Sequence, residues 1–138
     1  MTQTQDGGCY CGQVRYRVTG PAKTFGACHC RECQYISGGG PNYFQMRAGD
    51  SLTFIKGTPK AFARSDLEQP RVREFCPNCG THLLTRLPDR DDVVLKVGTL
   101  DDPASAGAVA FAIFCDDAQP FHQITPDVPT FAKRPPAR

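Results

Sequence analysis

Three cysteines, Cys28, Cys30 and Cys33, lie within the segment ACHCRECQYISGGG, which ends in three glycines. Thiolates are soft ligands, and this C-x-C-x-x-C spacing lets three of them reach a single zinc ion. Structural zinc sites have four protein ligands, whereas sites with three keep one position open for water or substrate. The segment therefore predicts either a zinc site completed by a distant residue or an open site of the catalytic type.

A second set of thiols comes from CYCG and CPNCG, in each of which a glycine directly follows the second cysteine. A glycine there can adopt positive φ, so the backbone folds back with its N–H groups towards sulfur. A redox dithiol in CPNCG is disfavoured, because the strand-like THLLTRL follows it instead of a long helix. The paired turns favour one closed structural zinc site made by Cys9, Cys11, Cys76 and Cys79.

Other arrangements of the cysteines rank lower. One would join Cys9 and Cys11 to Cys28 and Cys30, which strands Cys33 and separates the glycine-bearing turns. Cys115 follows an apolar run, where a lone cysteine is usually a small buried hydrophobe, so a role as fourth ligand is the minor alternative. Disulfides also rank second, because C-x-C and C-x-x-C pairs suit chelation better than cross-linking of distant strands.

Four other polar residues near these motifs receive structural or surface interpretations. His29 lies between two ligands and should point away from their metal, His82 falls on a strand, and His122 lies in a proline-rich tail. Glu32 could serve as a local base, although an exposed charge is the favoured interpretation.

A zinc ion held only by Cys28, Cys30 and Cys33 would carry a net negative charge, so it would activate water weakly. A soft external thiol suits its open position better, which points to a small-thiol ligand. Gly38–Gly40 would let a peptide-like ligand approach the backbone, with a flexible loop as the alternative. Arg15, Arg31 and Arg47 are candidates to bind ligand carboxylates, with exposed arginines as the default.

The 138 residues suit one domain, and 13 glycines and 12 prolines indicate short strands and many turns. Alternation over 13–20, with Val14, Tyr16 and Val18 on one side, predicts a half-buried strand. Arg31–Ser37 could form one or two helical turns. Two strands around Ala48–Asp50 and a buried strand over Asp92–Leu100 complete the all-β prediction.

The net charge of +2 and the lack of a lysine–arginine cluster disfavour nucleic acid as a partner. No apolar run approaches the roughly 18 residues of a membrane span. The N-terminal sequence lacks the pattern of a signal peptide, and we expect a cytoplasmic protein with reduced thiols.

Four segments together resemble the glutathione-dependent formaldehyde-activating family, also called the centromere protein V/Gfa family. They are GGCYCGQVRYRV, CHCRECQYISGG, FCPNCGTHL and IFCDDAQPFHQITPDVPTF, and the resemblance extends from about Gly7 to Phe131. We therefore expect a disordered N-terminus over 1–6, a zinc-binding β domain over 7–131 and a C-terminal tail over 132–138.

The resemblance implies a β-tent-like fold of antiparallel sheets with two zinc ions per chain. Cys9, Cys11, Cys76 and Cys79 would hold the structural zinc, and Cys28, Cys30 and Cys33 the catalytic-type zinc. It further implies a carbon–sulfur lyase that condenses glutathione with formaldehyde to S-hydroxymethylglutathione. The alternatives are a non-catalytic zinc-binding interaction module and a metal store or redox sensor that uses the clustered thiols.

Overall fold

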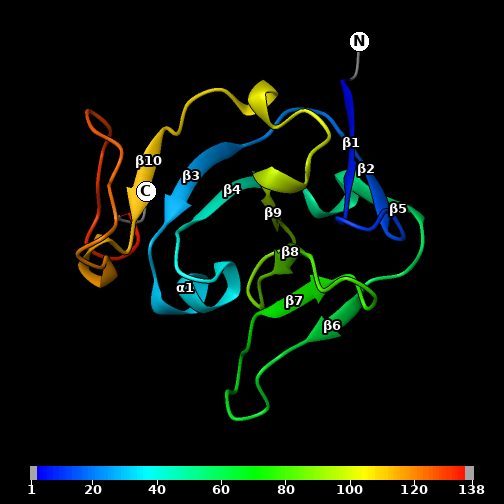
Figure 1. Cartoon of the computed structure of the whole chain (residues 1–138), viewed down its shortest axis with the longest axis horizontal. Coiled ribbons are helices and arrows are strands. Elements are labelled where there is room, and N and C mark those ends of the chain that lie inside the picture. The colour runs from blue at the N-terminus through cyan, green and yellow to red at the C-terminus, as the bar shows by residue number, and fades with distance from the viewer. Residues whose placement is uncertain (1–2, 136–138) are drawn as a thin grey trace.

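β-Strands form most of the regular structure within residues 3–135, the part of the chain that the computed structural model describes (Figure 1). One α-helix and several single-turn 3-10 helices accompany the strands in this part of the chain. The predicted all-β class is confirmed. The elements are β1 (Thr4–Gly8), β2 (Arg15–Thr19), β3 (Thr24–Cys28), α1 (Arg31–Ser37), β4 (Asn42–Arg47), β5 (Leu52–Lys56), β6 (Lys60–Phe62), β7 (Val72–Phe75), β8 (His82–Arg86), β9 (Val93–Lys96) and β10 (Phe111–Ile113).

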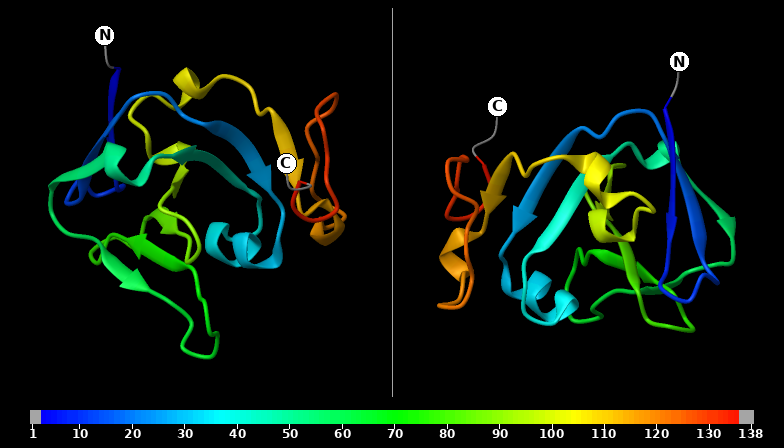
Figure 2. Two further views of the ribbon diagram at one scale, coloured as in Figure 1. Left: turned by 180° about the vertical axis from the view of Figure 1, so that it is seen from behind. Right: turned by 45° about the horizontal axis from the view of Figure 1, so that its top comes forward.

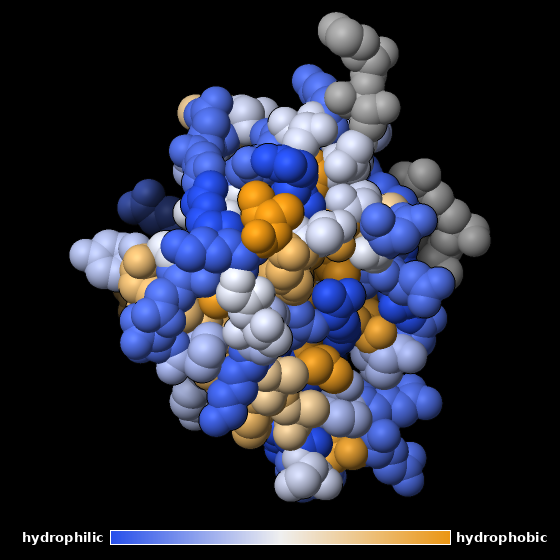
Figure 3. All heavy atoms as spheres, turned by 90° about the vertical axis from the view of Figure 1, so that its right-hand side faces the viewer, coloured by the Kyte–Doolittle hydropathy of each residue, from blue (hydrophilic) through white to orange (hydrophobic). Residues whose placement is uncertain are grey.

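The smaller sheet has three antiparallel strands in the order β1-β2-β5. Along β2, Tyr16 and Val18 are fully buried, whereas the side chains of Arg15 and Arg17 point outward, as the alternation predicts. Arg17 pairs with Asp6 at 2.9 Å. Figure 3 views the molecule from the side of this sheet, and hydrophilic side chains predominate there, with hydrophobic ones in small patches.

The larger sheet has the order β10-β3-β4-β9-β8-β7-β6, and all its strand pairs are antiparallel except β10 with β3. The parallel pair differs from the expected purely antiparallel sheets. After β9 the chain passes through two 3-10 helices, Val97–Thr99 and Pro103–Ala106, and crosses to the far edge of the sheet (Figure 2). It therefore enters β10 in the same direction as β3.

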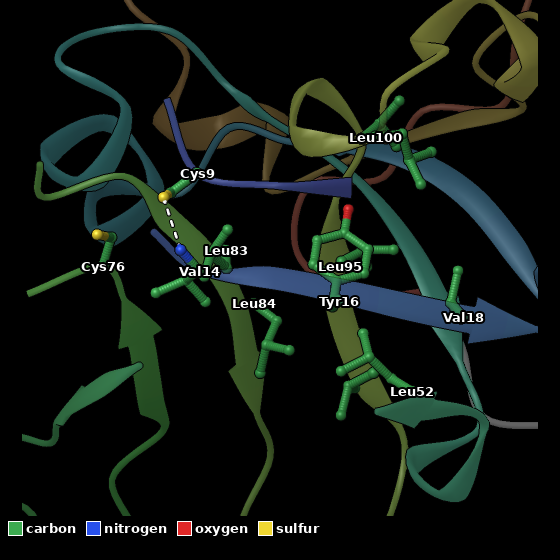
Figure 4. Close-up of a cluster of buried hydrophobic side chains, with 12 residues drawn as sticks. Cys9, Val14, Tyr16, Val18, Leu52, Cys76, Leu83, Leu84, Leu95 and Leu100 are labelled. Atoms are coloured by element: carbon green, nitrogen blue, oxygen red, sulfur yellow. Dashed lines mark hydrogen bonds between the residues drawn. The ribbon is translucent and has the colours of Figure 1, made fainter. Parts of the chain in front are cut away.

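The main hydrophobic core lies between the two sheets (Figure 4). The two strands predicted around Ala48–Asp50 both form, but they do not pair with each other. Strand β4 belongs to the larger sheet and β5 to the smaller one. A 3-10 turn at Gly49–Ser51 carries the chain from one sheet to the other. The core side chains are Cys9, Val14, Tyr16, Val18, Leu52, Cys76, Leu83, Leu84, Val93, Leu95, Val97 and Leu100.

Segment bounds differ from the sequence prediction in two places. The prediction of a disordered N-terminus over 1–6 is wrong for Thr4–Asp6, because these residues belong to β1 and pair with β2. The strand expected over Asp92–Leu100 ends at Lys96 and continues as a 3-10 helix. Residues 1–2 of the expected disordered end and 136–138 of the expected tail lie outside the described residues, and the domain limits stay predictions. None of the helices within the described chain has the length and hydropathy to cross a membrane.

Candidate metal centres

Within residues 3–135, the cysteines that could hold a metal form two groups. The first, which we call the core cluster, comprises Cys9, Cys11, Cys76 and Cys79, whose Sγ atoms all lie within 4.8 Å of one another. The Sγ atoms of Cys9 and Cys11 are 3.6 Å apart, and those of Cys11 and Cys76 are 3.8 Å apart. Four sulfurs about 2.3 Å from one zinc ion in tetrahedral geometry would be about 3.8 Å apart. The core cluster therefore fits a closed zinc site.

Hydrogen bonds donated to sulfur favour the thiolate form of Cys9 and Cys79 in the core cluster. The hydrogen bond with the Thr81 hydroxyl lowers the pKa of Cys79 to about 5. Gly12 and Gly80 adopt positive φ of 83° and 79°, the backbone conformation predicted for the turns. The bonds run to Cys9 from Val14 N–H (3.2 Å), to Cys11 from the Asn78 side-chain amide (3.3 Å), to Cys76 from Cys79 N–H (3.5 Å) and to Cys79 from the Thr81 hydroxyl (3.2 Å).

The core cluster joins the turn after β1 to the turn between β7 and β8. Cys9 and Cys76 are members of the main core, and their sulfurs lie at one end of it (Figure 4). Since β1 belongs to the smaller sheet and β7 to the larger one, a metal ion held here would tie the sheets together.

The second group, which we call the pocket cluster, comprises Cys28, Cys30 and Cys33. Cys28 is the last residue of β3, and Cys30 is the N-cap of α1. The sulfur of Cys30 accepts a hydrogen bond from Cys33 N–H at 3.3 Å. The sulfurs of Cys30 and Cys33 are 3.2 Å apart. Among the described residues, Cys115 lies with neither group. The alternative that combines Cys9 and Cys11 with Cys28 and Cys30 is therefore not the arrangement in the fold.

Charge in the pocket cluster concentrates on Cys30. Hydrogen bonding with Cys28, and then with Cys33, lowers the pKa of Cys30 to about 2. Hydrogen bonding with Cys30 raises the pKa of Cys28 to about 11, and hydrogen bonding with Cys28 raises the pKa of Cys33. A metal ion entering the cluster would therefore displace protons from Cys28 and Cys33.

The half-buried amine of Lys96 lies within electrostatic reach of the pocket cluster, and it was not singled out from the sequence. Burial lowers the pKa of Lys96, while electrostatic interaction with the cysteines of the pocket cluster opposes this change. Its Nζ donates a hydrogen bond to the Asn42 side-chain carbonyl at 2.8 Å. The signal was present in the alternation of β9, which places Leu95 in the main core and Lys96 on the opposite face of the sheet.

The three cysteines of the pocket cluster line part of a cavity of about 430 Å³. Arg73 pairs there with Glu32 at 3.1 Å and donates to the Thr85 hydroxyl at 3.3 Å, so Glu32 is a paired charge. The apolar lining includes Phe44, Met46, Val94, Phe111, Ile113 and Phe114, and the charged lining comprises Arg71, Arg73, Arg90, Arg134, Glu32 and Asp89.

The arginines considered from the sequence do not line this cavity. Arg15 pairs with Asp101 on the outer face of the smaller sheet. Arg47 is buried, and its guanidinium donates to the Gln45 side chain at 2.8 Å and to the Gly20 carbonyl at 2.7 Å. The arginines that do line it lie within or just before β7, just before β9 and in the C-terminal segment.

The glycine run has a structural function in the fold. Gly38 ends α1 in the left-handed conformation with φ 81°, and Gly38–Gly40 do not line the cavity. His122 Nε2 bonds to the Gly39 carbonyl at 2.6 Å, so its role is structural, as interpreted. His29 is buried, and its ring centroid lies 5.3 Å from that of His122. The structure therefore does not support ligand approach at these glycines.

Comparison with known proteins places these features in a family. The family model described as glutathione-dependent formaldehyde-activating enzyme matches residues 4–117. A curated protein of Halomonas elongata named for the same activity is 36% identical over 84 residues, which are 56% of this chain and 53% of that protein. The match thus spans about half the length of this relative. A crystal structure of a Rhodobacter sphaeroides protein has a TM-score of 0.59 at 18% identity, over 75% of this chain and 96% of that one, which shows the same fold.

Proposed function

Because the chain belongs to the glutathione-dependent formaldehyde-activating enzyme family, we propose that it is a zinc-dependent carbon–sulfur lyase-type enzyme that acts on the adduct of glutathione, or a similar small thiol, with an aldehyde. In the simplest case the adduct is S-hydroxymethylglutathione. The observation that carries this proposal is the position of the pocket cluster, which opens into a cavity with arginines on its wall.

The core cluster would hold a structural zinc ion, and Cys28, Cys30 and Cys33 would hold a second one. Three protein thiolates leave a position that a soft fourth thiolate can take, and a bound zinc ion favours the deprotonated form of an incoming thiol. The donor set fits this metal because all the ligands are sulfur and their spacing matches one small ion.

Charged side chains around the cavity would orient the thiol. Glutathione carries two carboxylates, and arginine binds carboxylates through two parallel N–H···O bonds. Arg71, Arg90 and Arg134 line the same cavity as the cysteine sulfurs, so a ligand can meet both. Lys96 adds a positive charge beside the sulfurs and offsets their negative charge.

In the proposed reaction the thiolate sulfur adds to the carbonyl carbon of the aldehyde. A carbon–sulfur bond forms, the π electrons of the carbonyl move to its oxygen, and that oxygen takes a proton. Cleavage of the adduct is the reverse sequence. The chain contributes by holding sulfur and carboxylates at fixed places, which converts an encounter of two solutes into a reaction between positioned groups.

The test measures exchange between free glutathione and S-hydroxymethylglutathione by NMR, with the zinc-loaded full-length chain. We expect the wild-type protein to accelerate exchange, Cys30→Ser to lose the acceleration, and Cys115→Ser to retain it as the control thiol outside both clusters. Equal rates with and without the wild-type protein, or full acceleration by Cys30→Ser, would overturn the proposal. Retained zinc without acceleration would favour the interaction-module alternative.

A further inference from the structure

The cavity beside the pocket cluster has an apolar wall on one side. Phe44 and Met46 of β4, Val94 of β9, and Phe111 and Ile113 of β10 all project from one face of the larger sheet. The same side chains pack around Cys28 and Cys33 as a second hydrophobic cluster. Formaldehyde has a single carbon and no apolar group, so its adduct with a thiol would leave this wall in contact with water.

Two local features hold aromatic rings in the wall. A Cβ atom at Gly26 would come within 2.5 Å of the Phe111 ring, so the glycine makes room for that ring on β3. The Phe111 ring in turn meets the Phe44 ring edge-on, with their centroids 6.0 Å apart. The wall is therefore a defined aromatic surface.

Phe114 adopts the left-handed backbone conformation, with φ 54° and ψ 38°. A bulky residue rarely occupies this region, because its Cβ crowds the backbone, and it stays there only when its surroundings hold it. The Phe114 amide donates to the Lys133 carbonyl at 2.9 Å, and the Lys133 ammonium lies 5.9 Å from the ring. A glycine would suit this backbone better, so the ring itself accounts for phenylalanine at this position.

The wall, the arginines and the sulfurs meet in one cavity, and together they specify a ligand with three parts. A thiol sulfur belongs at the pocket cluster, and carboxylates belong at the arginines. The remaining part is the group on the carbon that the sulfur attacks, and the aromatic wall is the surface left for it.

We propose that the physiological electrophile is an aldehyde that carries an apolar group, and that the aromatic wall binds this group in the thiol adduct. This inference rests on the proposed function. The bond changes are the same as for formaldehyde: the carbon–sulfur bond forms, the carbonyl becomes a hydroxyl by taking one proton, and no oxidant or reductant takes part.

Stable thioethers test the wall without turnover. S-methylglutathione places one carbon beyond sulfur, and S-benzylglutathione adds an aromatic ring. Calorimetry with the zinc-loaded chain should show at least about tenfold tighter binding of S-benzylglutathione, the discrimination expected for an apolar group in a fitted pocket. Equal affinities for the two thioethers would overturn the inference.

Variants locate the effect. Phe114→Gly removes the ring and suits the backbone, and Val94→Phe fills the space, so both should lose most of the preference for the benzyl compound. Tyr43→Ala is the matched control, because Tyr43 is the neighbour of Phe44 on β4 and its half-exposed ring does not line the cavity. Circular dichroism melts establish that each variant is folded. If the preference persists in both folded wall variants, the inference is wrong.

Exchange measurements separate this inference from the proposed function. NMR exchange of glutathione with its phenylacetaldehyde adduct should be accelerated more than exchange with its formaldehyde adduct, and this difference should be lost in Val94→Phe. Acceleration of the formaldehyde reaction alone by the wild-type protein would overturn the inference and leave the proposed function intact. Acceleration of neither reaction would overturn both.

Discussion

Cys30→Ser and Cys76→Ser should differ greatly in their effect on stability, although each removes one sulfur from a cluster. Serine is a preferred N-cap, so Cys30→Ser keeps a side-chain acceptor for Cys33 N–H at the start of α1. Cys76 has no exposed surface and belongs to the main core. The expected consequence is loss of one zinc ion in the first variant and loss of the fold in the second.

The stability that each zinc site contributes depends on how far apart its ligands lie along the chain. Cys11 and Cys76 are separated by 65 residues, so only the folded chain brings them together. Closing a loop of that length costs the unfolded chain about 4 kcal/mol, against about 2 kcal/mol for the short pocket cluster. The unfolded chain can also bind zinc through Cys28, Cys30 and Cys33, which reduces the stabilisation gained from that ion on folding.

Zinc binding to a structural site contributes roughly 10–16 kcal/mol at neutral pH, whereas the net stability of a domain is about 5–15 kcal/mol. Cys76→Ser should therefore abolish cooperative unfolding at neutral pH. Cys30→Ser should change the free energy of unfolding by about 1 kcal/mol, which corresponds to a shift in Tm of roughly 3–5 °C for a chain of this size.

The assay combines zinc content by plasma mass spectrometry with thermal unfolding followed by circular dichroism. Cys115→Ser serves as the control, with unchanged zinc content and a nearly unchanged melt. The reasoning fails if Cys30→Ser loses its cooperative transition as Cys76→Ser does, because the pocket cluster would then be a structural centre.

Two further predictions concern buried titratable groups. Burial lowers the pKa of His82 to about 4, so between about pH 6.5 and 4 the unfolded chain binds a proton that the folded chain excludes. As the pH is lowered through this range, the free energy of unfolding, measured with urea, should decrease more steeply in wild type than in His82→Gln. Equal slopes in the two proteins would contradict this prediction. Lys96→Met removes a positive charge beside the pocket cluster and should weaken zinc binding there by about 10–100-fold, as measured by competition with a chelator. Lys56→Met, which removes an exposed charge, should leave the zinc affinity unchanged, and equal affinities in the two variants would exclude a role for the Lys96 charge.

The grouping of the cysteines was accessible from the sequence because it depends on local backbone chemistry. A glycine after the second cysteine of a pair marks a turn with positive φ, and both marked pairs meet in the core cluster. The pocket cluster is local as well, since its three cysteines lie within six residues. Strand β2 followed from alternation, which is also a local signal, and the short helix expected over Arg31–Ser37 forms as α1.

The wall of the cavity could not be predicted from the sequence, because it is assembled from segments that lie far apart along the chain. Pairing of β10 with β3 joins residues more than 80 positions apart, and nothing in the short run AVAFAIF specifies a parallel partner. Arg134 lies in the segment expected to be a tail beyond the domain, yet it lines the cavity. The sequence therefore identified the sulfurs and missed the side chains that line the cavity beside them.

Separation along the chain also explains why the clusters should have different functions. Ligands far apart in sequence convert the free energy of metal binding into stability, because binding requires the folded chain, and the core cluster occupies the junction of the two sheets. Ligands close together in sequence contribute less to stability, so a metal ion there can keep a position open at little cost to the fold. The pocket cluster combines this local character with an adjoining cavity, and these are the conditions under which a zinc ion can exchange its fourth ligand.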